Sequence, residues 1–219
     1  MVFTVGVASL TIFFFALMMI SASLLYRKRM ELKYSIRNMF PFEFTYKTTL
    51  KTNFYSFLFI MLFVMSTIGF FITFDMSFTN GFNIYIMISG ILTAITIMAL
   101  FIVPLNNLRL HIIFAAIFFT LNFTCCGANV VNAWRINQSE VGPIPIVVIV
   151  IGIILVLSQF VLMLNPRLNL DFKAVEKVNE KGEKYYERPK WVVFAFTEWM
   201  NIIFLIINII NITILKAVS

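Results

Sequence analysis

The feature that most constrains the fold is a set of six apolar stretches, each long enough to cross a membrane. About 20 residues of apolar α-helix span the roughly 30 Å hydrocarbon core of a bilayer. The six stretches lie at about 3–25, 54–74, 84–104, 111–131, 144–164 and 191–215. Only 12% of the chain is charged, about half the usual fraction in soluble domains. We therefore expect an all-α integral membrane protein, residues 1–219 forming one transmembrane domain of six helices.

Positive charge is distributed unevenly between the two ends of these stretches. The segments 26–53 and 165–190 carry seven Lys or Arg residues each, and Arg109 lies on the same side, whereas only Arg135 and Lys216 lie on the other. Loops rich in Lys and Arg remain in the cytoplasm. This asymmetry predicts that 26–53 and 165–190 are cytoplasmic loops and that both termini lie outside.

The net charge of +7 belongs largely to these two loops next to the membrane. Anionic headgroups of the inner leaflet are the expected counter-charge for such loops, so the charge does not indicate nucleic-acid binding. The preference for Phe, Ile, Asn and Lys suggests an AT-rich genome. We expect a location in the cytoplasmic (plasma) membrane of a bacterium.

Both basic loops contain patterns of their own. Apolar residues at near-helical spacing predict a short amphipathic helix over 28–40, ending at Pro41, on the inner leaflet or continuing the first span. It would serve either as a docking surface or as a collar on the membrane. Alternating runs at 173–178 and 184–187 around an Asn/Gly turn suggest a β-hairpin on the cytoplasmic face. The alternative there is a solvated charged loop.

Two apolar stretches carry asparagines with the same N-x6-N-x2-N spacing. They are Asn122, Asn129 and Asn132 in the fourth stretch and Asn201, Asn208 and Asn211 in the sixth. At about 100° per residue, each triplet occupies one narrow face of its helix. Because both helices run in the same direction, the three pairs are expected to meet at matched depths. The asparagines would then hold the helices together, line a polar path, or reflect composition alone.

A second candidate cluster lies near the cytoplasmic end of the bundle. Glu198 is the only acidic residue within a predicted span, Gln159 is expected at nearly the same depth, and His111 lies at the start of the fourth stretch. Ionisable residues at depth are a functional hypothesis with a partner to be named. One interpretation is a protonatable cluster at the inner mouth of a pathway. The other is a neutral Glu198 hydrogen-bonded to Gln159 as packing.

The sequence contains no motif that indicates catalysis. A Gly-rich phosphate loop, HExxH and GxSxG are all missing. The single histidine excludes a multi-histidine metal or haem site, and Cys125 with Cys126 supply too few ligands for zinc. We therefore expect no enzyme activity, no cofactor and no metal.

Two functional hypotheses follow. The favoured one is a non-catalytic subunit or accessory component of a membrane complex, which binds a cytoplasmic or membrane protein partner through loops 26–53 and 165–190. The alternative is a small transporter or permease-type protein, with a polar pathway lined by the asparagines and Glu198. The spans are not broken by Gly or Pro and show no inverted repeat, which weighs against a self-sufficient transporter.

Overall fold

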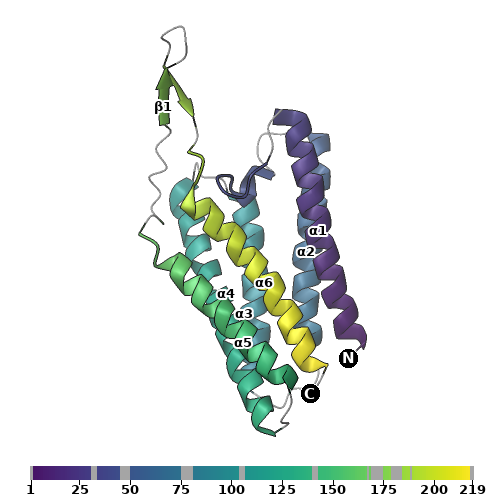
Figure 1. The fold of residues 1–219 in the computed structure, drawn as a ribbon. Helices are drawn as coiled ribbons and strands as arrows, with labels where there is room; N and C mark the ends of the chain where they lie inside the picture. Colours follow the sequence, from purple (N-terminus) through teal and green to yellow (C-terminus); the bar gives the residue numbers. More distant parts are fainter. Residues whose placement is uncertain are drawn as a thin grey trace.

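In a computed structural model, the described part of the chain contains six long helices (Figure 1). The structure describes residues 2–30, 34–44, 50–74, 81–103, 107–139, 143–166, 168, 175–178, 184–187 and 189–217. The helices are α1 (Val2–Met30), α2 (Leu50–Phe74), α3 (Gly81–Ile102), α4 (Leu108–Ser139), α5 (Pro143–Met163) and α6 (Val193–Lys216). All six are long and apolar enough to cross a membrane. The prediction of six spans and of an integral membrane protein is thus confirmed.

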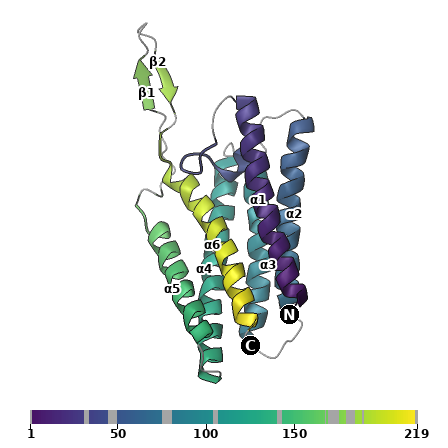
Figure 2. The ribbon, with the colours of Figure 1, turned by 45° about the vertical axis from the view of Figure 1, so that its right-hand side comes forward.

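The helices pack mainly as antiparallel neighbours along the chain, with α6 added last against α1, α4 and α5. The N- and C-termini lie at the same end of the bundle, as an even number of crossings requires (Figure 2). Near this end, the Thr4 hydroxyl donates to the carbonyl of Thr73, and the Lys216 ammonium group donates to the carbonyl of Phe74. These contacts join the start of α1 and the end of α6 to the end of α2.

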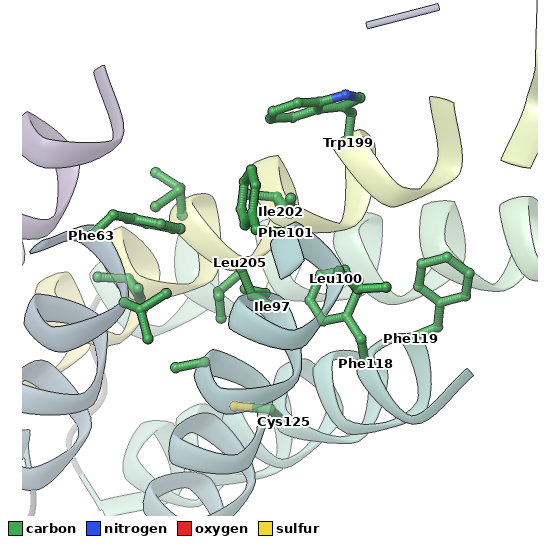
Figure 3. Close-up of a cluster of buried hydrophobic side chains, with 14 of the residues drawn as sticks. Phe63, Ile97, Leu100, Phe101, Phe118, Phe119, Cys125, Trp199, Ile202 and Leu205 are labelled. Carbon is green, nitrogen blue, oxygen red and sulfur yellow. The ribbon is translucent and has the colours of Figure 1, made fainter. Parts of the chain in front are cut away.

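The most buried span is α6. Its apolar side chains interleave with those of α2, α3 and α4 in a core of phenylalanines and branched aliphatics. Figure 3 shows Trp199, Ile202 and Leu205 of α6 facing Phe101 of α3 and Phe63 of α2. By contrast, the outward face of α5 is entirely aliphatic and aromatic, as contact with lipid requires. The position of α6 buries its glutamate and its three asparagines inside the protein.

Close approach of α2 and α3 depends on one glycine. A Cβ atom built at Gly90 would overlap the ring of Phe71. Phe71 is fully buried, so the ring has little freedom to move away.

The segment 34–44 is not the amphipathic helix expected over 28–40. Helix α1 continues to Met30, residues 31–33 lie outside the described part, and 34–40 form a turn that leads into the short 3₁₀ helix η1 (Pro41–Phe44). Phe40 is completely buried. The apolar residues of this segment find more contact inside the bundle than on the leaflet surface, which explains why their near-helical spacing does not produce a helix.

Two short strands follow α5. Strand β1 (Val175–Val178) pairs antiparallel with β2 (Lys184–Glu187), with Val175 opposite Glu187 and Val178 opposite Lys184. The paired strands of the predicted hairpin are therefore present, and its turn lies outside the described residues. In Figures 1 and 2 the two strands project beyond the ends of the helices rather than lying across them.

Candidate functional site

The buried asparagines gather where α4 and α6 meet. All six asparagines of the two triplets are at most 4% exposed. Amide groups in this position have neither water nor lipid to bond, so their partners must come from the protein. We call this row of asparagines the polar seam.

At the first two heights the asparagines face each other as the spacing predicts. Asn122 Nδ2 donates to the backbone carbonyl of Asn201 at 2.9 Å and lies 3.5 Å from its Oδ1. One heptad further on, Asn129 Nδ2 donates to Asn208 Oδ1 at 3.1 Å. The offset of 79 residues is the same in both pairs. The polar seam therefore joins two parallel helices in register.

The third pair, Asn132 with Asn211, does not meet in this way. Asn211 Nδ2 donates instead to the backbone carbonyl of Val148 on α5, at 2.9 Å. Gly152 of α5 lies beside this contact: a Cβ built there would overlap the side chain of Val130 on α4, and it would be in ordinary van der Waals contact, at 3.7 Å, with Asn211 Nδ2. With no side chain at this position, α5 packs closely against α4, and the Val148 carbonyl of α5 lies within hydrogen-bond distance of Asn211. Asn132 is also buried, on α4. The end of the polar seam is thus shared among three helices.

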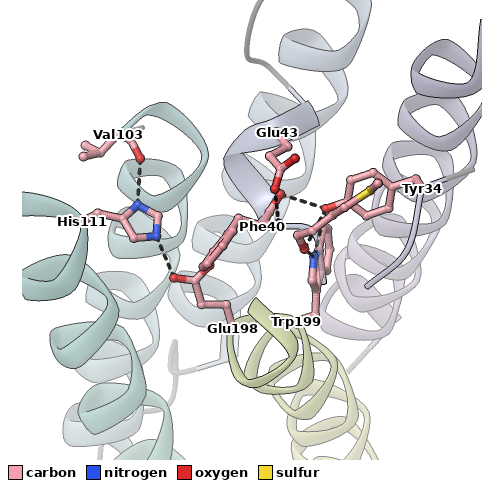
Figure 4. Close-up of polar contacts among 8 residues, drawn as sticks. Tyr34, Phe40, Glu43, Val103, His111, Glu198 and Trp199 are labelled. Carbon is pink, nitrogen blue, oxygen red and sulfur yellow. Dashed lines mark hydrogen bonds and ion pairs between the residues drawn. The ribbon is translucent and has the colours of Figure 1, made fainter. Parts of the chain in front are cut away.

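The ionisable residues near the other end form a direct pair. His111 Nε2 lies 2.8 Å from Glu198 Oε1, and both side chains are completely buried (Figure 4). His111 Nδ1 lies 2.8 Å from the carbonyl of Val103. A carbonyl only accepts, so Nδ1 carries a proton and Nε2 faces the carboxyl group. The shared proton can then sit on either residue, and the pair has no net charge in either state.

Gln159 does not join this pair, contrary to the expected hydrogen bond with Glu198. Its Nε2 lies 3.3 Å from the Sγ of Cys126 on α4. Gln159 faces α4 rather than Glu198. At this level Phe196 and Met200 of α6 line a groove with α5, and Glu198, two residues from each, points about 200° away from them.

Aromatic side chains cover the His111–Glu198 pair. The rings of Phe40 and Phe42 lie 5.9 Å and 5.7 Å from the His111 ring, both nearly perpendicular to it. The ring of Phe194 lies 6.3 Å away. Because Phe40 and Phe42 belong to the segment 34–44, this segment forms the cover of the site.

Trp199 of α6 holds the segment 34–44 in place through hydrogen bonds. Its Nε1 donates to the carbonyl of Met39 at 2.9 Å and lies 3.0 Å from the Tyr34 hydroxyl, which itself donates to the carbonyl of Phe40 at 2.8 Å (Figure 4). Tyr34, Phe40 and Trp199 are not among the site residues expected from the sequence. Aromatic residues on either side of Pro41, in a loop otherwise rich in basic residues, were the available signal.

Several buried oxygens of the site have no hydrogen-bond donor within the described part of the chain. They are Asn122 Oδ1, Asn129 Oδ1, Asn211 Oδ1, Gln159 Oε1 and Glu198 Oε2. The corresponding amide nitrogens all donate to protein acceptors, so the orientation of these amides is determined by their bonds. The site therefore presents five buried acceptor oxygens without a donor in the described part of the chain.

The chemistry open to this site is proton sharing and hydrogen bonding. Among the residues that the structure describes, no group of three His, Cys, Asp or Glu side chains could hold a metal ion. Cys125 and Cys126 are free thiols, both buried. Comparison of the chain with known protein families, curated proteins and solved structures gives no match.

Proposed function

We propose that this protein is a non-catalytic component of a membrane complex, with a bundle held together by its polar seam and a partner bound at its basic end. The observation that carries the proposal is that the polar side chains of the site point into the bundle and bond there to other helices. The nine candidate residues are at most 4% exposed. Their hydrogen bonds join α4 to α6, α4 to α5, and α5 to α6.

Contacts of this kind support a structural role for the seam rather than a pathway. Among the residues that the structure describes, one groove opens between α3 and α4 and another between α5 and α6. Their linings are mostly apolar and include none of the nine candidate residues. Polar groups used as interhelical bonds are a common means of joining membrane helices.

The β1–β2 hairpin is the partner surface that the fold favours. A two-stranded hairpin is marginally stable by itself in water. It projects away from the helices (Figure 2), and both strands present a free backbone edge to which a partner strand could be added. In the proposed orientation this surface is cytoplasmic and continuous with the basic loops.

Co-purification tests this proposal. The tagged chain is extracted from its membrane in mild detergent, beside a variant in which 175–187 is replaced by a Gly/Ser linker of equal length. We expect a stoichiometric protein with the parent chain and its loss from the hairpin variant. The matched control is Asn129→Leu, which weakens the seam and should retain the partner. A chain that purifies alone from its native membrane would contradict the proposal.

Transport remains a second candidate because of the unpaired oxygens. A buried carboxylate oxygen of Glu198 and amide oxygens of Asn122 and Asn129 are ligands suited to protons or hard cations. Purified protein in liposomes with an enclosed pH dye tests this candidate. Proton flux that is abolished by Glu198→Gln, and retained in the exposed-site variant Thr120→Val, would favour transport over the accessory role.

A further inference from the structure

A groove between α3 and α4 combines an apolar floor with a cation at one end. It has a volume of about 660 Å³ and is lined by Phe82, Tyr85, Phe123, Thr124, Gly127, Ala128, Val131 and Arg135. Its depth comes from the small residues of α4, since a Cβ added at Gly127 meets nothing within 4 Å. The Thr124 hydroxyl bonds to its own helix, at the Thr120 carbonyl. The floor is therefore effectively apolar, with aromatic walls.

Arg135 lies at the end of the groove where the membrane boundary is expected. Its guanidinium carbon is 4.9 Å from the centre of the Phe82 ring, and its neighbour Trp134 is 56% exposed. Exposed tryptophan and tyrosine are typical of the headgroup level, and Tyr85, 44% exposed, belongs to the same end. A positive charge at this level, above an apolar groove, complements an anionic headgroup.

The length of the groove matches one leaflet. From Arg135 to Thr124 the helix rises about 16 Å, close to half of the roughly 30 Å hydrocarbon core. A packed helix of another protein would need contact over a full span. Further along the same helix, α4 exposes the bulky side chains of Ile113 and Ile117 instead. We propose that this groove binds the acyl chain of one anionic phospholipid, whose phosphate contacts Arg135. The proposal is independent of the function proposed above.

Native mass spectrometry of the full chain tests this site, with phosphatidylglycerol or phosphatidylcholine added to the detergent micelles. We expect one tightly bound phosphatidylglycerol. Gly127→Leu should abolish that binding by filling the groove. Arg135→Gln should lower the preference for phosphatidylglycerol over phosphatidylcholine about fivefold, since one basic residue at the membrane surface contributes about that much.

Two matched variants serve as controls. Gly6→Leu places the same side chain in open space on α1, and Arg109→Gln removes a charge from the opposite end of α4; both should bind as the parent chain does. If Gly127→Leu does not fold, Val131→Phe fills the same groove from a side chain that is 43% exposed.

Three results would overturn the proposal. The first is equal phosphatidylglycerol binding by Gly127→Leu and Gly6→Leu. The second is an unchanged lipid preference in Arg135→Gln. The third is a protein chain that co-purifies without added lipid and is lost in Gly127→Leu, while lipid binding persists in that variant. Such a result would mean that a helix of another protein occupies the groove.

Discussion

Within the bundle, His111 Nε2 and Glu198 Oε1 are each other's hydrogen-bond partners, so losing either side chain alone should leave a buried polar group unpaired. Glu198→Leu leaves His111 Nε2 without its partner in a buried site, and His111→Leu does the same to Glu198. We expect each to lower the free energy of unfolding by about 1–3 kcal/mol, and the double variant to lose less than the sum. Glu198→Gln, which can still hydrogen-bond, should be close to the parent.

Equilibrium unfolding in mixed detergent micelles measures these differences. The control is Thr120→Val, because Thr120 is exposed and its hydroxyl bonds only to its own helix, at the Ala116 carbonyl. Additive losses in the double variant would show that the two side chains are not coupled.

The asparagine pairs give a second prediction at the same scale. Interhelical hydrogen bonds in membranes contribute about 0.6 kcal/mol on average and up to about 1.7. Asn129→Leu and Asn208→Leu should therefore show a coupling within that range, since their side chains bond directly. Asn122→Leu with Asn208→Leu should be additive, because these residues belong to different pairs. The same unfolding assay measures the coupling in the two double-mutant cycles, Asn129 with Asn208 and Asn122 with Asn208. Coupling of equal size in the two cycles would disprove the pairing.

At the scale of elements, the segment 34–44 acts as a cover attached to α6 by Trp199. Trp199→Phe removes the indole N–H that bonds to the Met39 carbonyl but keeps an aromatic ring in the core. We expect backbone amides of this segment to exchange about fivefold faster, since one hydrogen bond contributes about 1 kcal/mol. Amides in the middle of α3 and α4 should not change.

Hydrogen exchange followed by mass spectrometry resolves these regions. Trp134→Phe is the control, because Trp134 is exposed on the far part of α4. Uniformly faster exchange throughout the chain would mean that Trp199 supports the whole bundle rather than the cover.

For the whole molecule, the charge distribution predicts that the basic end faces the cytoplasm and both termini lie outside. Ser77→Cys and Asn179→Cys, each in a background lacking Cys125 and Cys126, would be treated with a membrane-impermeant maleimide in intact cells. We expect labelling at 77 before lysis and at 179 only after it. Labelling at 179 in intact cells would reverse the orientation.

Much of the architecture could be predicted from the sequence, because length and hydropathy are properties of each helix alone. The six spans follow from them, and so do the two strands from a local alternation. The asparagine spacing also predicted that α4 and α6 meet in register, since residues seven apart return to one helix face. These inferences needed no knowledge of the neighbouring helices.

The rotation and neighbours of each helix were decided only by the tertiary structure. Glu198 faces α4 and not α5 because its side of α6 is opposite the α5 contact. Asn211 bonds to the Val148 carbonyl of α5, a helix that packs closely on α4 because Gly152 leaves room for Val130. Phe40 is buried above His111 because the cover fills the end of the bundle. Each of these outcomes depends on which surfaces fit together across the fold, and a one-dimensional pattern contains no such information.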